Sequence, residues 1–323
     1  MFKTIGFLLL LLPFTLSSAV NAAEYPDVDM TPVKVSPHVW YVKGKAGTAT
    51  ENEGFVSNAG FIITGDGVVV FDGLGTPALA TMMLKEIRKL TQEPIRKVIV
   101  SHYHADHVYG LQVFKQEGAE ILAPAGAINY LNSDSAKNRL EERRVSLSPW
   151  VDDNTKLVPP DRYFKESEEF KMGEVEFTVS VLGSAHSEGD LTLFVQPDKV
   201  LFSGDVIFDE RIPWLGDANT VNWLETLNAI KTLQPSAIIP GHGGLSSDPE
   251  ALIKLTHDYL EFVRAKMKAA VDDWVPFDTA YDDVDWGNYE YLPAFFEANK
   301  RNAYQVYLSL EQESMKEKEK QEK

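Results

Sequence analysis

The sequence predicts an α/β protein, and three observations lead to this prediction. Short apolar runs that are typical of strands alternate with longer amphipathic runs that are typical of helices. Histidines and aspartates follow several of the predicted strands, where open α/β sheets usually carry their functional side chains. The chain has 323 residues, of which 44% are hydrophobic, and this is enough for one large domain with an extension.

The first half of the chain predicts a hairpin followed by a strand, helix, strand unit. Gly65-Asp66-Gly67 is a tight turn between two apolar runs, which is typical of a hairpin. The next amphipathic run has Thr76 as its N-cap and Pro77 at the first helical position, and both favour a helix start. The predicted strands are residues 39–42, 60–64, 68–71 and 97–100, and the predicted helix is residues 77–90.

The second half repeats this pattern less regularly. Residues 175–181 alternate as a half-buried strand does, and Gln196-Pro197-Asp198 connects the strands of a second predicted hairpin. We expect each cluster of histidines or aspartates to lie just past a strand end, and no strand after residue 239. The predicted strands are residues 120–123, 175–181, 191–195, 199–202 and 237–239, and the predicted helices are residues 135–145 and 222–233.

Beyond about residue 245 the sequence changes to helical segments. Residues 249–271 and 293–311 predict helices, joined by an acidic and aromatic link around residues 281–286. Residues 315–323 are almost entirely Lys, Glu and Gln, which predicts a frayed helix end or a solvated tail. The aromatic side chains of this region either cover a subunit contact or pack back on the main domain, so the sequence does not predict the oligomeric state.

The N-terminus predicts a cleaved signal peptide over residues 1–22. A positive charge at Lys3 precedes an apolar run over residues 5–16, and small residues lead up to Ala22. The apolar run is short for a bilayer span, so an uncleaved membrane anchor is the weaker alternative. We therefore expect a periplasmic or secreted protein, without stable membrane insertion once the signal is removed.

The composition limits the partners of the chain. There is no cysteine, so neither disulfides nor thiolate ligands are available, although an exported protein could form disulfides. The formal net charge of −17 would repel phosphate backbones, and this excludes nucleic acid as a substrate. We expect a small-molecule substrate.

Five of the seven histidines and two aspartates form a spaced set that predicts a metal site. Imidazole and carboxylate are ligands that Zn²⁺ prefers, and seven of them suffice for two ions with open coordination positions. Alternate residues of an extended segment point the same way, so His102 and His104 can reach one ion, while Asp106 and His107 turn to the other side. The full set is His102, His104, Asp106, His107, His186, Asp205 and His242.

The order of these motifs along the chain resembles the metallo-β-lactamase superfamily. The motifs are His102-Tyr103-His104-Ala105-Asp106-His107, Ala185-His186, Ser203-Gly204-Asp205 and Pro240-Gly241-His242-Gly243. The likeness covers roughly residues 33–244, and Asp72 matches the family's early structural aspartate. It implies an αββα sandwich with metals at one edge. The implied division is a signal peptide at residues 1–22, a metallo-β-lactamase-fold domain at residues 28–245 and a C-terminal helical extension with a charged tail at residues 246–323.

The resemblance also implies how the ligands divide between two metal ions. Asp205 would bridge the ions, and Asp106 is predicted as a catalytic residue as well as a ligand. Two zinc ions per chain are expected, with iron or manganese as alternatives. Ions about 3.5–4 Å apart can share a hydroxide that serves as the nucleophile. The first ion would be held by His102, His104 and His186, and the second by Asp106, His107 and His242.

Departures from the β-lactamase branches favour other hydrolases of the superfamily. Those branches commonly place a cysteine or a serine where this chain has Asp205, whereas an aspartate bridge resembles glyoxalase II and the lactonases. The flavodiiron branch places a glutamate where this chain has His104. Residues 51–60 and 217–220 resemble quinoprotein-relay-type zinc metallohydrolases.

The resemblance therefore implies hydrolysis of an ester, thioester or lactone-like bond. Three alternatives stay open at this point. The first is a class B-like β-lactamase that hydrolyses amides. The second is a persulfide dioxygenase, which uses one iron held by two histidines and an aspartate. The third is a metal- or ligand-binding envelope protein whose site is inert.

Two loops near the predicted ligands are expected to wall the substrate pocket, residues 43–55 and 207–215. Within the second loop, Phe208 and Trp214 either line this pocket or pack in the core. Arg211 could bind an anionic group of the substrate by a bidentate contact, but a surface salt bridge is the preferred interpretation.

Three further polar residues have simpler interpretations. Asp72 either caps the turn before Gly73 or makes a hydrogen bond that orients a histidine ligand. His38 and His257 stand alone in the sequence, and we expect both to be packed or solvated side chains rather than ligands.

Overall fold

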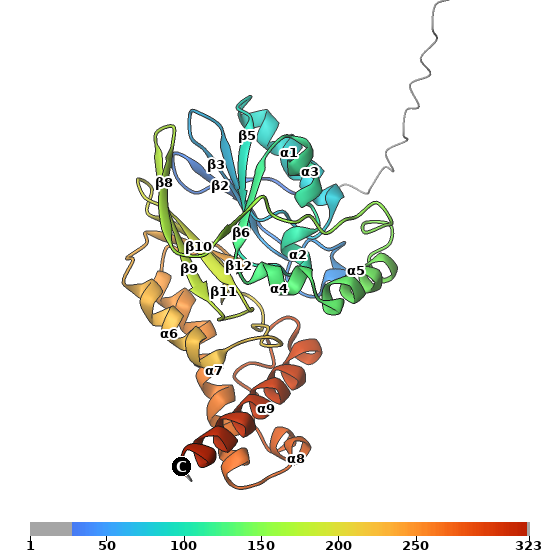
Figure 1. Ribbon diagram of the computed structural model, residues 1–323, viewed down its shortest axis with the longest axis vertical. Coiled ribbons are helices and arrows are strands. Elements are labelled where there is room, and N and C mark those ends of the chain that lie inside the picture. Colours follow the sequence, from blue (N-terminus) through green and yellow to red (C-terminus); the bar gives the residue numbers. More distant parts are fainter. Residues whose placement is uncertain (1–27, 322–323) are drawn as a thin grey trace, which may run out of the picture.

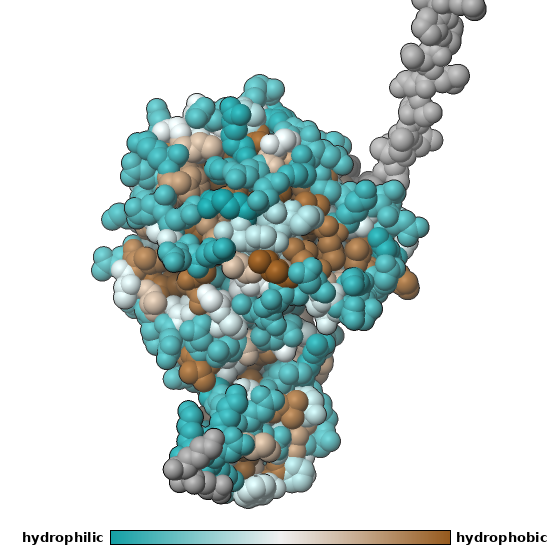
Figure 2. Space-filling view, in the orientation of Figure 1, coloured by the Kyte–Doolittle hydropathy of each residue, from teal (hydrophilic) through white to brown (hydrophobic). Residues whose placement is uncertain are grey.

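The computed structural model describes residues 28–321, which form two sheets packed face to face with helices on their outer sides (Figure 1). The predicted signal peptide lies outside these residues. Within them, no helix combines the length and the apolar character that crossing a membrane would need. The face of the molecule shown in Figure 2 is largely hydrophilic, with separate apolar patches.

The first sheet has seven strands that lie in chain order. Neighbouring strands are antiparallel as far as β4 and parallel from β4 to β7. The predicted turn joins β3 to β4, with φ of +86° at Gly65 and +136° at Gly67, a region that glycine adopts readily. The strands are β1 (Val33–Lys34), β2 (Val39–Val42), β3 (Ala59–Ile63), β4 (Val68–Phe71), β5 (Ile95–Ile99), β6 (Glu120–Pro124) and β7 (Arg162–Phe164).

The second sheet has five strands in the order β12-β11-β10-β9-β8. Its pairs are antiparallel, except that β11 and β12 are parallel. The predicted hairpin over residues 191–202 is confirmed as β10 and β11. The strands are β8 (Glu168–Met172), β9 (Val175–Gly183), β10 (Asp190–Val195), β11 (Val200–Phe208) and β12 (Ala237–His242).

The prediction that each ligand cluster lies past a strand end is wrong for two residues. Asp205 lies inside β11, and His242 is the last residue of β12. The segment Ser203-Gly204 suggests a loop, but Gly204 adopts φ of +52° and the register with β12 shifts on both sides of it. Gly204 therefore forms an irregularity within the strand, after which β11 continues through three more buried apolar residues to Phe208.

Helices cover the outer face of each sheet, as the αββα prediction requires. The helix α1 (Pro77–Leu90) begins as predicted, because the Thr76 hydroxyl accepts a hydrogen bond from the Leu79 amide at 3.1 Å. Helix α3 (Leu111–Gln116) packs against α1, β5 and β6, while α6 (Thr220–Lys231) and α7 (Pro249–Asp272) pack against β11. The other helical elements before the C-terminal extension are η1 (Ala49–Glu51), α2 (Ala105–Val108), α4 (Ala127–Leu131) and α5 (Asp134–Ser146).

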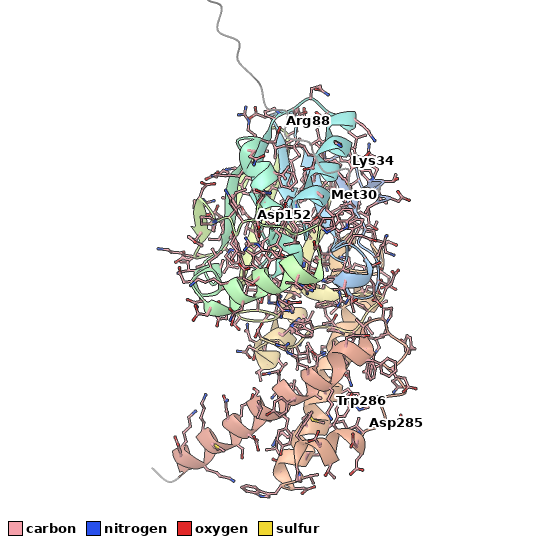
Figure 3. The ribbon with its side chains drawn as sticks, turned by 90° about the vertical axis from the view of Figure 1, so that its right-hand side faces the viewer. Met30, Lys34, Arg88, Asp152, Asp285 and Trp286 are labelled. Atoms are coloured by element: carbon pink, nitrogen blue, oxygen red, sulfur yellow. The ribbon has the colours of Figure 1, made fainter. Side chains whose placement is uncertain are left out.

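The C-terminal extension consists of α7, α8 (Phe277–Asp282) and α9 (Phe295–Gln321), and it projects from one end of the sandwich (Figure 1). The predicted boundary between residues 245 and 246 falls between β12 and α7. Figure 3 shows Trp286 among the helices of this extension. Trp286 and Phe295 are buried there, whereas Phe296 is 83% exposed. The aromatic link thus packs largely within the extension, and α8 is a helix that its acidic sequence did not predict.

An aromatic pair holds the two sheets together at their interface. The Phe71 ring of β4 and the Phe202 ring of β11 stack with centroids 5.0 Å apart, and both are buried. Gly60 of β3 leaves room for this ring, because a Cβ atom at Gly60 would lie 2.1 Å from Cε1 of Phe202. The strand that carries Asp205 is therefore positioned by packing against the first sheet.

We predict that Phe202→Ala lowers the free energy of unfolding by about 3–5 kcal/mol, because it removes a buried ring and leaves a cavity between the sheets. Chemical denaturation followed by circular dichroism measures this. The matched change Phe296→Ala removes an exposed ring of the extension and should stay within about 0.5 kcal/mol. Equal losses for the two variants would contradict this account of the interface.

Candidate metal centre

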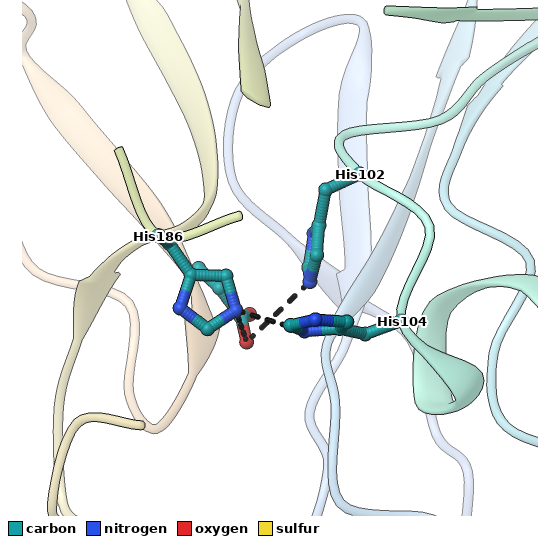
Figure 4. A group of neighbouring side chains, drawn as sticks. His102, His104 and His186 are labelled. Carbon is teal, nitrogen blue, oxygen red and sulfur yellow. Dashed lines mark hydrogen bonds and ion pairs between the residues drawn. The ribbon is translucent and has the colours of Figure 1, made fainter. Parts of the chain in front are cut away.

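All seven predicted ligands converge at one edge of the sandwich. Their potential ligand atoms fall into two groups, and within each group the atoms lie within 4.8 Å of one another. Figure 4 shows His102 and His104 reaching from one segment toward His186, which belongs to another. The first group is His102, His104, His186 and Asp205, and the second is Asp106, His107 and His242.

The carboxylate of Asp205 lies between the two groups. Its Oδ2 is 3.4 Å from Nε2 of His186 and 3.3 Å from Nε2 of His242, and its Oδ1 is 3.1 Å from Nε2 of His107. One buried carboxylate thus contacts imidazoles from both groups. This is the position that a ligand shared by two ions requires.

Glycines let the backbone segments around Asp205 approach closely. A Cβ atom at Gly241 would lie 2.0 Å from Oδ1 of Asp205, and one at Gly204 would lie 2.5 Å from Cβ of Ser101. Any other residue at either position would have to displace Asp205 or the segment that leads to His102. Steric crowding therefore explains why glycine occupies the middle position of the Ser-Gly-Asp and Pro-Gly-His motifs.

Asp72 orients two of the histidines, and this settles its role between the two that the sequence left open. Its Oδ2 accepts hydrogen bonds from Nδ1 of His107 and from the Ser101 hydroxyl, both at 2.8 Å. Because that hydroxyl donates to Asp72, it can only accept at the 2.9 Å contact with Nδ1 of His102. Both rings therefore carry their proton on Nδ1 and present Nε2 to the centre.

Backbone carbonyls outside the centre orient two of the remaining three rings. Nδ1 of His186 donates to the Trp214 carbonyl at 3.0 Å, and Nδ1 of His242 donates to the Val56 carbonyl at 2.8 Å. His104 is turned the other way, with Nδ1 3.0 Å from Nε2 of His186 and Nε2 3.7 Å from Oδ2 of Asp217. Each imidazole thus directs one nitrogen inward.

The segment formed by Val56, Ser57 and Asn58 contacts two of the ligand loops. Besides the Val56 carbonyl, the Ser57 hydroxyl donates to the Asp106 carbonyl at 2.5 Å. The Asn58 amide donates to the carbonyls of Pro240 and Gly243, on either side of His242, at 2.8 and 3.0 Å. This 56–58 segment fixes the second group relative to the first sheet.

Several atoms at the centre are buried without a hydrogen bond. Among the described residues these include Nε2 of His102, Nε2 of His107 and Oδ1 of Asp205. Buried polar atoms are normally satisfied, because leaving them unpaired costs free energy. Unpaired imidazole nitrogens beside an unpaired carboxylate oxygen match the donor set of zinc and similar ions. The residues present therefore fit a metal centre.

Burial and charge set the protonation of this cluster. Burial lowers the pKa of His186 to about 3 and holds that of His102 well below its usual value. Burial also acts to lower the pKa of His107, but the carboxylates around that ring outweigh it and raise the pKa well above its usual value. Burial acts to raise the pKa of Asp205, yet the surrounding imidazoles hold it well below its usual range.

A cavity of about 380 Å³ opens onto the centre. Both predicted loops wall it, the first with Thr48 and Gly54 and the second with Phe208 and Trp214, so the prediction of these walls is confirmed. No local sequence pattern predicts the other walls. These include Tyr109, Tyr130, Arg139 and Arg143 near the first sheet, and Glu297 and Arg301 of α9.

The preferred interpretation of Arg211 as part of a surface salt bridge is wrong. Arg211 lines the cavity, its Nε is buried without a hydrogen bond, and it forms no ion pair with any described residue. The two lone histidines stay away from the centre, as predicted. Nδ1 of His38 lies 3.0 Å from Oδ1 of Asp198, and Nδ1 of His257 lies 3.6 Å from Oδ1 of Asp258.

Comparison with known proteins identifies similar chains. The model of the metallo-beta-lactamase superfamily matches residues 52–242. Metallo-beta-lactamase IND-1 of Chryseobacterium indologenes is 24% identical over 233 residues, which cover 70% of this chain and 87% of that protein. Acyl-coenzyme A thioesterase MBLAC2 of Gallus gallus is 29% identical over 172 residues, which cover 50% of this chain and 61% of that protein.

Solved structures show the same fold. The sec-alkylsulfatase Pisa1 from Pseudomonas sp. superposes with a TM-score of 0.68 at 18% identity, over 86% of this chain and 50% of that chain. A metallo-beta-lactamase from Pontibacter korlensis superposes with a TM-score of 0.57 at 19% identity, over 72% of this chain and 99% of that chain. At these identities the likeness concerns the fold alone.

We predict that Asp72→Asn lowers the affinity for metal about 10- to 100-fold. The new amide can replace one acceptor oxygen, but its NH₂ group would face a donor, either Nδ1 of His107 or the Ser101 amide. Competition with a chelator measures the affinity. Asp66→Asn, a change in the turn before β4, should bind metal like the unmodified protein. Unchanged affinity in Asp72→Asn would show that the outer hydrogen bonds do not matter.

We also predict that metal affinity falls as the pH falls from about 8 to about 6. The raised pKa of His107 keeps this ring protonated near neutral pH in the metal-free protein, so a metal ion must displace that proton. Chelator competition across this range measures the trend, and proton release into a weakly buffered solution on metal addition measures the displaced proton. A metal affinity that does not change with pH would contradict the assignment of His107 as a ligand that must lose a proton to bind metal.

Proposed function

Because the chain belongs to the metallo-β-lactamase superfamily, we propose that it is a metal-dependent hydrolase that cleaves an ester, thioester or lactone-like bond of a small molecule. One observation carries this proposal. The Asp205 carboxylate contacts imidazoles of both ligand groups, with separations of 3.1–3.4 Å to His107, His186 and His242. Such an arrangement suits two ions, for which zinc is the simplest choice.

Two bound ions would polarise a carbonyl group and lower the pKa of a coordinated water near neutrality. His102, His104 and His186 would hold one ion, and Asp106, His107 and His242 the other. The cavity admits the substrate beside these residues, and Phe208 and Trp214 are among its walls. Asp205 is the carboxylate shared between the two groups.

Asp106 is the ligand carboxylate best placed to orient a water molecule in the cavity. Its Oδ2 is 3.3 Å from Nε2 of His242, its side chain is 25% exposed, and it lines the cavity. Charges on His107 and His242 outweigh burial and hold its pKa well below the usual range. Oδ2 of Asp106 therefore stays ionised, and it can orient the attacking water by accepting a hydrogen bond from it.

The relatives suggest which bonds to test. One relative is named an acyl-coenzyme A thioesterase, and this supports the thioester class. Two others, which cover 70% and 76% of this chain, are named metallo-beta-lactamases, so β-lactam amides are the second candidate. A single-iron dioxygenase is less favoured, because seven donors in two groups exceed what one ion needs. The predicted export of the chain would bring it to substrates of the cell envelope.

We predict that metal-loaded protein hydrolyses members of a panel of thioesters, esters, lactones and β-lactams, and that Asp205→Asn lowers kcat/KM at least about 100-fold. Loss of a residue that hydrogen-bonds to a metal ligand typically lowers metal affinity or activity about 10- to 100-fold, so loss of the shared ligand Asp205 should lower the activity more. Elemental analysis should find two metal ions per chain before the substitution and fewer after it.

Asp153→Asn serves as the matched control, because that side chain is fully exposed on the surface and its loss should change neither metal content nor turnover. Identical rates for metal-loaded and metal-stripped protein across the whole panel would overturn the hydrolase proposal. A single iron per chain together with oxygen consumption would favour the dioxygenase instead.

A further inference from the structure

The cavity beside the metal centre collects arginines in a strongly acidic chain. The sequence has 31 Lys and Arg residues against 48 Asp and Glu residues. Four arginines nevertheless line this cavity, Arg139 and Arg143 of α5, Arg211 after β11 and Arg301 of α9. These residues come from three separate parts of the chain, so the fold concentrates them.

Arg211 is the arginine closest to the predicted ligands. Its Nη1 lies 3.2 Å from Nδ1 of His242. That nitrogen already donates its proton to the Val56 carbonyl at 2.8 Å, so it has no lone pair to offer Arg211. The contact therefore joins two donors and does not satisfy the guanidinium.

No other described group satisfies Arg211 either. Its Nε is buried and makes no hydrogen bond, and no carboxylate of residues 28–321 lies within ion-pair distance. Arg211 is partly buried, and Asp106 and Asp205 favour its charge only from beyond ion-pair distance, so its buried Nε lacks a hydrogen-bond acceptor, which costs free energy. The guanidinium presents a planar fork of donors that matches an oxyanion. An anionic group in the cavity would supply the missing acceptor.

A second donor in the cavity has no partner. The hydroxyl of Tyr109 is buried, makes no hydrogen bond among the described residues and belongs to a side chain that lines the same cavity. Arg301 is held at the rim, where its guanidinium lies 4.8 Å from the centre of the Trp214 ring. The cavity thus combines unused donors with positive charge.

Acidic side chains of the cavity do not cancel this charge. Asp106 and Asp205 face the metal ligands and would be neutralised by bound cations. The other two are Asp217, which lies 3.7 Å from His104, and Glu297 of α9. Glu142 pairs with both Arg139 and Arg143 and offsets one of their charges, so the balance beside the centre is modestly positive once metal is bound, in contrast to the chain as a whole.

We propose that the substrate is anionic, with a carboxylate, sulfate or phosphate group that pairs with Arg211 next to the bond that is cleaved. The arginines of α5 and α9 raise the local concentration of such a substrate against the repulsion of the acidic surface. The C-terminal extension is then part of the specificity pocket, because Arg301 belongs to α9. This inference deepens the hydrolase proposal and rests on it.

The test compares matched substrates that differ only in a carboxylate and its neutral methyl ester. Arg211→Met should lower kcat/KM for the anionic member roughly 10- to 100-fold, mainly through KM. The substitution removes the charge-assisted hydrogen bonds between the guanidinium and the substrate carboxylate, and the loss of such bonds corresponds to a change of this order. The neutral member should change less than about twofold. Arg211→Lys should recover part of the loss, since it keeps the charge without the fork.

Arg96→Gln is the matched control. It removes one positive charge from the exposed start of β5, at the end of that strand opposite the ligand loop, and should leave both substrates unaffected. Elemental analysis of each variant shows whether metal content is preserved. Equal effects of Arg211→Met on the anionic and the neutral substrate, with full metal content, would overturn the proposal while leaving hydrolysis intact.

A binding measurement separates this inference from the hydrolase proposal. Acetate, sulfate and phosphate are titrated into metal-loaded protein while tryptophan fluorescence is recorded, because Trp214 lines the cavity. At least one anion should bind, with a dissociation constant raised roughly tenfold or more in Arg211→Met, and the anion that responds most identifies the oxyanion. Binding of all three that is unchanged in the variant would contradict the role of Arg211, even if no substrate is found.

Should Arg211→Met fail to fold, Arg301→Gln provides the second variant. Its side chain is exposed, so a loss of a few-fold for the anionic substrate is expected, and this loss should shrink at high ionic strength. If Arg301→Gln shows no selective loss for the anionic substrate at low ionic strength, this result would contradict the proposal that Arg301 of α9 attracts that substrate.

Discussion

The structure depends on one constraint, the burial of many charged and polar ligand groups at a single edge of the sandwich. His102, His107 and His186 are fully buried, and Asp205 is nearly so. Such a cluster is costly unless every atom has a partner. Here the outer nitrogens find acceptors in the protein, whereas the inner atoms, including Nε2 of His102 and Oδ1 of Asp205, find none. The protein thus supplies hydrogen-bond partners for the outer atoms of the cluster, whereas a bound cation would supply the partner of the inner atoms.

The two-sheet architecture meets this constraint because each sheet contributes one part of the cluster. The segment after β5 carries four of the residues, and β11, β12 and the loop before β10 carry the rest. Sheet packing around Phe202 sets the distance between the two parts, and Gly204 and Gly241 allow the backbones to approach. The 56–58 segment then joins them by hydrogen bonds to both ligand loops. A displacement of either sheet would separate Asp205 from half of the imidazoles that it contacts.

The features that depend on short stretches of sequence could be predicted, whereas those that depend on contacts between distant segments could not. The histidine motif, the turn at Gly65 and the cap at Thr76 are short-range patterns, and the structure places them as expected. The continuation of β11 through Asp205 was missed, because Ser203 and Gly204 resemble a loop when the neighbouring strand is unknown. The role of Arg211 was misjudged for a related reason. Whether an arginine meets solvent or a cavity depends on elements far along the chain, and no local pattern encodes that.

The C-terminal extension is tied to the metal centre through the loop that follows β11. The buried Asn302 of α9 accepts from the Leu215 amide at 2.9 Å and donates to the Pro213 carbonyl at 2.7 Å. Between these residues lies Trp214, whose carbonyl holds Nδ1 of His186. A single short loop thus connects a helix of the extension to a ligand imidazole, and it also carries Arg211. Because one loop orients a ligand and lines the substrate cavity, the extension influences both through the same contacts. It is therefore better described as part of the site than as a separate appendage.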